Sequence, residues 1–258
     1  MYKDELKEAL EAAKIASKKI LEIYHTNFNV EIKSDDSPVT EADKKADVLI
    51  RKHLGKAFPK YAFLTEESID DGKRLLNDYV WIIDPLDGTS DFVNKDGEFT
   101  VNIALCYKHE IVVGVVAIPC SGDIYYASKG DGAFVIRNGI STKICVNKKL
   151  DDLTFLVSHF HNTEKVMDVA KRHQDKIKHI EKIGSSIKAC LIAEGKAEIY
   201  LKFDDNTKEW DTAAFQLIVE EAGGVMQKHN GEKIIYNRED VYNRNGFIIA
   251  NRKENLFE

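Results

Sequence analysis

The sequence predicts an α+β fold built from stacked layers of helices and strands. Apolar residues recur at three- and four-residue steps over residues 3–24 and again after residue 40, which indicates two early helices. Short strand-like runs then follow one another between residues 62 and 136. Helices and strands alternate in the second half of the chain. Strands that come together early, followed by alternation, indicate a layered architecture.

Apolar spacing and chain breakers place the elements of the first half. A helix is expected over residues 3–24, and a loop, SDDSPVT, ends at Thr40. The second helix ends at Gly55 and Pro59, and one of its faces carries Ala46, Leu49, Ile50 and Leu54. Strands are expected at 62–64, 79–83, 99–106, 111–118, 124–127 and 133–136.

The second half is expected to alternate. The predicted strands are 153–157, 179–183, 197–202 and 247–250. The predicted helices are 164–172, 186–194 and 212–222, the last of which is stopped by a Gly-Gly pair. The polar stretch at 147–152 predicts a boundary near residue 150 between two lobes of a single catalytic unit spanning 1–258.

Composition excludes several classes of protein. The chain has 258 residues, 43% of them hydrophobic, and a formal net charge of −6. An acidic protein has no overall attraction for nucleic acid or anionic lipid, so we expect no nucleic-acid partner. No stretch reaches the roughly 18 apolar residues of a spanning helix. Charges interrupt the N-terminal segment, so we expect neither a transmembrane segment nor a signal peptide.

The cysteines predict a reducing compartment. Cys106, Cys120, Cys145 and Cys190 form no CxxC pair. Free thiols are therefore expected in place of a disulfide framework or a structural zinc site. We expect a cytoplasmic protein, and the sequence leaves peripheral association with the inner membrane and the oligomeric state open.

The most informative segment is WIIDPLDGTSDF at residues 81–92. An apolar strand ends there in a turn that contains a proline and a glycine, so Asp84, Asp87 and the Leu86 carbonyl can converge on one point. Carboxylate and carbonyl oxygens suit a hard divalent cation such as Mg²⁺. Taken alone, the same segment also fits a solvated acidic turn after a strand.

Two further acidic groups lie at the ends of predicted elements. Glu66 and Glu67 follow the run at 62–64, and Asp211 opens the helix predicted at 212–222. Taken alone, the glutamate pair also fits a solvated face, and Asp211 also fits an N-cap. Carboxylates held close together repel one another, so a cluster of all these groups needs cations to be stable.

Four motifs resemble the inositol monophosphatase-like superfamily of Mg²⁺-dependent, Li⁺-sensitive phosphatases. They are VTEAD at 39–43, TEES at 65–68, DPLDGT at 84–89 and WDTAAFQLIVEEAGG at 210–224, in the superfamily's order. The resemblance implies a layered αβαβα sandwich of the inositol monophosphatase/fructose-1,6-bisphosphatase type. It also implies a metal-binding lobe at 1–150 and a substrate-binding lobe at 151–258 that supplies Asp211.

The superfamily's site residues carry over by position in these motifs. The implied ligands for two or three Mg²⁺ ions are Glu66, Asp84, the Leu86 carbonyl, Asp87 and Asp211. The implied catalytic residues are Asp43, near a further metal site or the attacking water, Thr89, which orients that water, and Glu67, just outside the ligands. Metal-activated water suits phosphate-ester hydrolysis, in which catalysis is mostly positioning and electrostatics. The amides of Gly88 and Thr89 are expected to bind phosphate oxygens.

Segments outside the carboxylates indicate the substrate. GEFTVNIAL at 97–105, VSHFHNT at 157–163 and GSSIKACLIAEGKAEIYLKF at 184–203 resemble the CysQ-type 3′(2′),5′-bisphosphate nucleotidases. That group hydrolyses adenosine 3′,5′-bisphosphate to AMP and phosphate. The resemblance places His161 near the nucleoside, although a lone histidine there also fits a surface loop. Ser90-Asp91 departs from the Lys-Glu common in that group, which bears on substrate preference and leaves the reaction class unchanged.

A bisphosphate substrate needs a second anion site. Ser185, Ser186 and Lys188 lie at the start of the helix predicted at 186–194, where amides and hydroxyls favour phosphate. Lys202 closes the next strand, and a cation there favours a second phosphate over inositol hydroxyls. Many relatives carry Arg at this position, so bidentate binding is lost here. Taken alone, Ser185 also fits an N-cap, and Lys188 a solvated helix residue.

The leading interpretation is a Mg²⁺-dependent phosphomonoester hydrolase acting on a small phosphorylated metabolite. It would convert adenosine 3′(2′),5′-bisphosphate, left after sulfate activation or sulfotransfer, to AMP and phosphate. Two alternatives stay open. One is an inositol monophosphatase with a broad substrate range, and the other is a regulatory binding protein of the transcription machinery.

Overall fold

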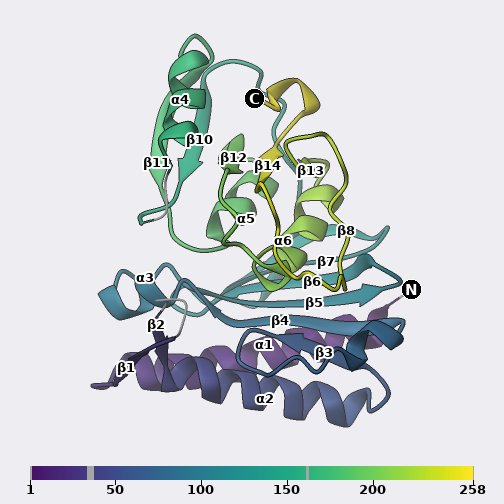
Figure 1. Cartoon of the computed structure of the whole chain (residues 1–258). Coiled ribbons are helices and arrows are strands. Elements are labelled where there is room, and N and C mark those ends of the chain that lie inside the picture. The colour runs from purple at the N-terminus through teal and green to yellow at the C-terminus, as the bar shows by residue number, and fades with distance from the viewer. Residues whose placement is uncertain (1, 34–37, 161–162, 258) are drawn as a thin grey trace.

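The computed structural model describes residues 2–33, 38–160 and 163–257. Helices and sheets alternate in layers (Figure 1). The outermost layer holds α1 (Lys3–Tyr24) and α2 (Glu41–Ala57), which pack on each other and on a seven-stranded sheet. The opposite face of this sheet carries α6 (Glu209–Glu221), with α5 (Ile187–Ala193) beside it. A five-stranded sheet and α4 (Glu164–Arg172) complete the αβαβα order, which confirms the predicted fold class.

Buried alanines on the inner face of the first layer help its two helices to pack closely. Four alanines of α1 are fully buried, and α2 adds further buried alanines between the helices and the sheet. A capping box fixes the start of α2: the Thr40 hydroxyl accepts a hydrogen bond from Ala42 N, and the Asp43 carboxylate accepts one from Thr40 N. The cap therefore sets the position of Asp43 at the end of the layer.

The seven-stranded sheet follows chain order. Its strands are β3 (Ala62–Thr65), β4 (Tyr79–Asp87), β5 (Thr100–Tyr107), β6 (Glu110–Ile118), β7 (Asp123–Ser128), β8 (Gly132–Arg137) and β9 (Ile140–Ile144). Only the β3–β4 pair within this sheet is parallel. The centre of the sheet is covered by helices on both sides, and α6 approaches so closely that a Cβ at Gly114 would lie 2.3 Å from the Ala214 carbonyl oxygen.

The five-stranded sheet has the order β11-β10-β12-β14-β13. Its strands are β10 (Leu153–Val157), β11 (Ile177–Lys182), β12 (Ile199–Lys202), β13 (Val225–Gln227) and β14 (Phe247–Ala250). β10 runs parallel to both of its neighbours, whereas β14 is antiparallel to β12 and β13. Buried Val166 and Val169 of α4 belong to the same hydrophobic core cluster as Phe155 of β10. The two sheets use residues on either side of the 147–152 stretch, while the assignment of lobes stays a prediction.

Several elements differ from those predicted. The expected loop before Thr40 contains a strand, β2 (Pro38–Thr40), paired with β1 (Val30–Ile32), and residues 34–37 of that loop lie outside the described residues. β1 is exposed along its length, so no burial pattern marks it. β9, β13, the short helix α3 (Thr89–Asn94) and the 3₁₀ turns η1 (Lys73–Leu76) and η2 (Lys253–Asn255) were also not predicted.

Helix α6 begins at Glu209, three residues before the predicted start at 212. Asp211 therefore lies inside the first turn, and its carboxylate accepts a hydrogen bond from Lys208 N at 2.6 Å. All four cysteines are free, as predicted, with Cys106 and Cys190 buried and the other two exposed. No helix in the described part of the chain has the length and apolar character needed to cross a membrane.

Candidate active site

The centre of the candidate site is the end of β4. Asp84 is 2% exposed, and its Oδ1 accepts a hydrogen bond from Leu86 N at 3.0 Å. Gly88 then turns the chain with φ of +87°. A Cβ at Gly88 would lie 3.1 Å from Ser185 Cβ and 3.2 Å from the Glu98 carbonyl oxygen. Glycine suits this position because of the left-handed backbone and the close approach of the neighbouring chain.

Four of the proposed ligands influence one another electrostatically. Burial raises the pKa of Asp84 well above its usual value, and the charges of Glu66, Asp87 and Asp211 raise it further. Burial likewise raises the pKa of Asp211 to about 8, with added repulsion from Glu66 and Asp87. Residues from β4, from α6 and from the turn after β3 therefore form one anionic cluster.

The carboxylate of Asp87 is held by several donors. The backbone N and Oγ of Ser186 donate to Asp87 Oδ2 at 2.7 and 2.5 Å. Asn102 Nδ2 and Thr100 Oγ1 donate to the same oxygen, each at 3.3 Å. These two residues of β5 were not predicted as site residues from the sequence. Their signal was two polar residues at alternate positions of an otherwise apolar strand, which places both on one face.

Lys33 is a further site residue that the sequence did not indicate. Its Nζ lies 2.8 Å from Glu66 Oε1 and 2.5 Å from Glu67 Oε1. Burial lowers the pKa of Lys33, but attraction to the two glutamates outweighs it, so the pKa lies above its usual value. Lys33 lies between exposed β1 and the predicted loop, where no pattern distinguishes it from a solvated lysine.

Thr89 and Asp43 come together although they are distant in sequence. Thr89 Oγ1 lies 3.0 Å from Asp43 Oδ1 and 3.2 Å from the Leu86 carbonyl oxygen, either of which can accept its hydrogen. The other carboxylate oxygen of Asp43 is occupied by the Thr40 amide and hydroxyl at the α2 cap. The Thr89 oxygen keeps lone pairs for a hydrogen bond from water.

The donor chemistry of the cluster fits a hard divalent cation. Among the described residues, no three His, Cys, Asp or Glu side chains are close enough to hold a metal ion as they stand. Glu66 pairs with Lys33, and Asp87 is bonded to Ser186. The remaining features favour cations: all donors are oxygens, and the repulsion that raises the carboxyl pKa values would be relieved by positive charge. The ligand set stays a proposal.

Two lysines predicted to bind a second phosphate are buried beside the cluster. Lys188 is 2% exposed, which contradicts the reading of a solvated helix residue, and its Nζ donates to the Ile183 and Ser185 carbonyls at 3.0 and 2.7 Å. Burial lowers the pKa of Lys188 to about 8, and repulsion from Lys202 adds to this effect against attraction to Asp87. Lys202 Nζ lies 3.2 Å from Asp204 Oδ2.

Ser185, Ser186 and His161 were also predicted to bind substrate. Ser185 is not the N-cap of α5, since Ser186 holds that position without a side-chain cap bond. Ser185 has φ of +46°, and its buried Oγ has no hydrogen-bond partner within the described chain. His161 lies outside the described residues. Its neighbour His159 contacts Glu98 Oε2 at 2.7 Å, and that oxygen also accepts from Gly184 N.

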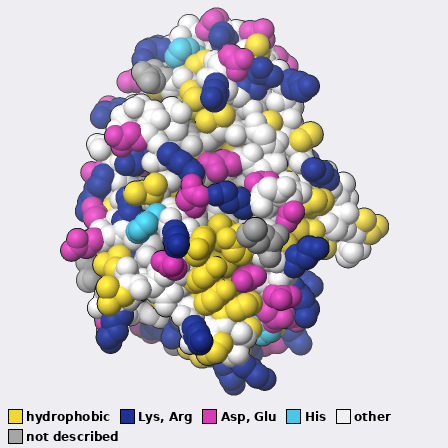
Figure 2. All heavy atoms as spheres, turned by 90° about the vertical axis from the view of Figure 1, so that its right-hand side faces the viewer, with side chains coloured by type: hydrophobic (Ala, Val, Ile, Leu, Met, Phe, Trp, Pro, Cys, Tyr) yellow, Lys and Arg dark blue, Asp and Glu magenta, His cyan; other side chains and the backbone are white. Residues whose placement is uncertain are grey.

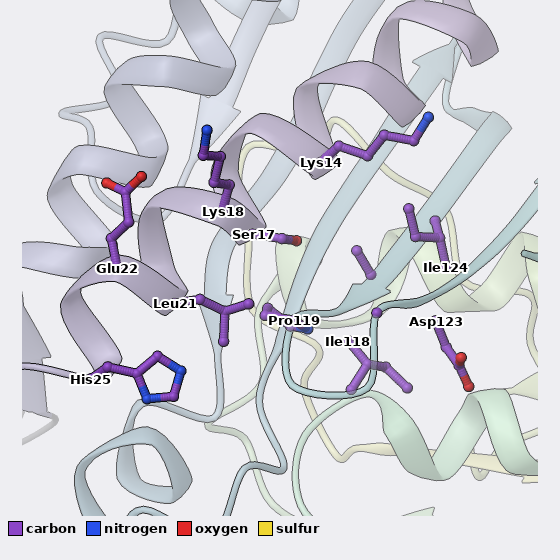
Figure 3. A pocket seen from close by; sticks show the side chains of 12 residues that line it. Lys14, Ser17, Lys18, Leu21, Glu22, His25, Ile118, Pro119, Asp123 and Ile124 are labelled. Carbon is purple, nitrogen blue, oxygen red and sulfur yellow. The ribbon is translucent and has the colours of Figure 1, made fainter. Parts of the chain in front are cut away.

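A cavity of about 560 Å³ lies apart from these residues, between α1 and the turn that joins β6 to β7 (Figure 3). Leu21, Ile118 and Ile124 give it an apolar lining, with Lys14 and Lys18 at its edge. None of the proposed ligands or substrate residues lines it. The cavity is therefore not part of the candidate active site.

Comparison with known proteins identifies the family of the chain. The model of the inositol monophosphatase family matches residues 2–257. The chain is 36% identical over 242 residues to the 3′(2′),5′-bisphosphate nucleotidase CysQ of Buchnera aphidicola, covering 92% of this chain and 89% of that protein. It is 31% identical to the putative Nus factor SuhB of Neisseria meningitidis, covering 82% of this chain and 81% of that protein. The crystal structure of CysQ from Bacteroides thetaiotaomicron superposes with a TM-score of 0.84 at 34% identity, covering 98% of this chain and 99% of that one. The chain belongs to the inositol monophosphatase family.

Proposed function

We propose that this protein is a Mg²⁺-dependent 3′(2′),5′-bisphosphate nucleotidase that converts adenosine 3′,5′-bisphosphate to AMP and phosphate. The similarity to proteins named CysQ over nearly the whole chain supports this substrate class. The acidic cluster would act on one phosphate while the buried lysines bind the other. Such an enzyme needs two anion sites of different chemistry side by side.

The observation that carries the proposal is the burial of Lys188. Within the described chain no carboxylate forms an ion pair with it, and its ammonium bonds only carbonyl oxygens and lies 5.0 Å from the Tyr200 ring centroid. A buried cation that touches no carboxylate is costly unless a ligand supplies negative charge in direct contact with it. Lys202 brings a second positive charge to the same place. A bound phosphate would compensate both.

The residues of the cluster have complementary tasks in hydrolysis. The carboxylates of Glu66, Asp84, Asp87 and Asp211 and the Leu86 carbonyl would hold Mg²⁺, which when bound supplies charge neutralisation and activation of water. Thr89 Oγ1, paired with Asp43, would accept a hydrogen bond from the attacking water and so orient it. The backbone amides at Gly88 and Thr89 would bind oxygens of the reacting phosphate.

The two alternatives receive less support from the site. An inositol monophosphate carries one phosphate, which leaves Lys188 without an ion-pair partner and Lys202 with Asp204 alone. The regulatory reading has the SuhB similarity in its favour. On the face shown in Figure 2, Lys and Arg side chains are interspersed with Asp and Glu, with a hydrophobic patch between them. A mixed face of this kind gives nucleic acid no continuous positive surface there.

A panel of phosphate-release assays tests the proposal. Purified protein would be given adenosine 3′,5′-bisphosphate, inositol 1-phosphate and fructose 1,6-bisphosphate, each with Mg²⁺ and with excess chelator. We expect the nucleotide to have the highest kcat/KM and chelator to abolish turnover. Preference for inositol 1-phosphate, or full activity in chelator, would contradict the proposal.

A further inference from the structure

We infer that Glu209, Arg74 and Arg238 form a buried clamp that positions Asp211 relative to the Glu66 turn. This inference rests on the proposed function, because it concerns residues that would hold Mg²⁺. The clamp is needed because like-charged carboxylates repel one another, and Glu66, Asp84 and Asp211 are carried by three separate segments of the chain. Such groups would separate unless the chain segments that carry them were tied together.

The first half of the clamp fixes the start of α6. Glu209 is fully buried, at 0% exposure, and its carboxylate accepts hydrogen bonds from Asn237 N at 2.6 Å, Arg238 N at 2.8 Å and Arg238 Nε at 3.2 Å. Its own backbone N donates to the Val241 carbonyl at 2.9 Å. Asp211 lies two residues further along the same helical turn, so the direction of the Asp211 side chain depends on where Glu209 is held.

The partner of Glu209 is the chain segment 236–243, which lies between β13 and β14. Figure 1 shows this connection running beside α6 toward the seven-stranded sheet, and Tyr236 N bonds the His109 carbonyl in the β5–β6 turn. The guanidinium of Arg238 donates to the Tyr242 carbonyl and to Asn243 Oδ1. Asn243 Nδ2 in turn donates to the Lys208 carbonyl at 2.8 Å, again at the start of α6.

The second half of the clamp ties the Glu66 turn to the same segment. Arg74, in η1, is 3% exposed and donates from Nη1 to Asn237 Oδ1 at 2.8 Å and from Nη2 to the Arg238 carbonyl at 2.9 Å. Its Nε donates to Asp70 Oδ2 at 2.9 Å. Asp70 lies four residues after Glu66, so one short segment anchors both sides of the cluster.

A purely stabilising role is the competing explanation, and the chain offers a matched control. Glu198 is also buried, at 1% exposure, and its carboxylate accepts hydrogen bonds from Thr154 N and Asn147 Nδ2. These partners belong to the start of β10 and to the chain before it, and none is a proposed ligand. Glu198→Gln therefore disturbs a comparable buried carboxylate without touching α6 or η1.

The test is calorimetric titration of Mg²⁺ into substrate-free protein, with the melting temperature measured for each variant. We expect Glu209→Gln and Arg74→Lys to weaken Mg²⁺ binding about tenfold or more. Residues that hold metal ligands in position typically change metal affinity by about this much when they are mutated. Glu198→Gln should lower the melting temperature comparably and leave Mg²⁺ affinity unchanged. In the two clamp variants, excess Mg²⁺ should restore most of kcat.

Unchanged Mg²⁺ affinity in the clamp variants, or an equal loss in Glu198→Gln, would overturn the inference. Should Glu209→Gln fail to fold, Arg74→Lys decides the matter, because it retains the charge and alters only the guanidinium bonds to residues 70, 237 and 238. Wild-type protein that does not bind Mg²⁺ would refute the proposed function itself, which is a separate result.

Discussion

Replacing Lys188 by Met tests the second phosphate site at its most buried residue. The ammonium has three donors, of which two are engaged by the Ile183 and Ser185 carbonyls, so about one remains for a phosphate oxygen. A hydrogen bond between charged groups contributes roughly 1.5–3 kcal/mol. We therefore expect kcat/KM for adenosine 3′,5′-bisphosphate to fall about ten- to a hundredfold in Lys188→Met. Turnover of 3′-AMP should change much less, because it leaves the second site empty.

The assay compares both substrates in wild type, Lys188→Met and Lys202→Met, with exposed Lys196→Met as control. Lys202→Met should show the same selectivity more weakly, because Lys202 is already paired with Asp204. Stability should change little: methionine loses two bonds to carbonyls but removes a buried charge whose pKa is lowered to about 8. An equal loss on both substrates would place the lysines in the scaffold or the metal site. An unchanged bisphosphate rate would refute the reasoning.

Four further outcomes follow from the same site. KM for the bisphosphate should rise above pH 8 as Lys188 loses its proton, while KM for 3′-AMP stays constant; parallel profiles would contradict this. Because the folded pKa of Lys188 lies below its unfolded value of 10.5, the free energy of unfolding should also rise with pH between about 8 and 10.5, as denaturant titrations can check. Asp84→Asn should reduce turnover at least about a hundredfold by weakening metal-activated water chemistry, and near-native activity would exclude that role. Li⁺ and Ca²⁺ should inhibit at fixed Mg²⁺, Ca²⁺ because its larger coordination shell misplaces the water, and rates equal to those in NaCl controls would count against both claims.

The order of layers and most elements could be predicted because burial leaves a periodic signal. Helix α1 matches its predicted bounds of 3–24, and the long strands of the first sheet are mostly apolar. The elements that were missed lack this signal. β1 is wholly exposed, and α3 has only six residues. Short or exposed elements are set by tertiary contacts, which spacing along the chain does not reveal.

The proposed ligands were identified from the turn at 84–89 and from the resemblance of four sequence motifs, whereas most of their supporting partners were not identified. Lys33, Asn102 and Glu209 reach the site or its clamp through contacts with residues 33, 84 and 28 positions away, respectively. Lys188 was identified as a phosphate contact from its place at the start of a predicted helix, but its burial depends on packing against Tyr200 and the two carbonyls. Side-chain burial of this kind has no marker in a single sequence.

The central claim is that the carboxylate cluster cleaves one phosphate while the buried lysines hold the other. Its most direct test identifies the products formed from adenosine 3′,5′-bisphosphate in Mg²⁺, by chromatography with phosphorus NMR. If the lysines hold the 5′ phosphate, the products are 5′-AMP and inorganic phosphate. Release of the 5′ phosphate to leave 3′-AMP, or no release under conditions in which inositol 1-phosphate is hydrolysed, would contradict the account.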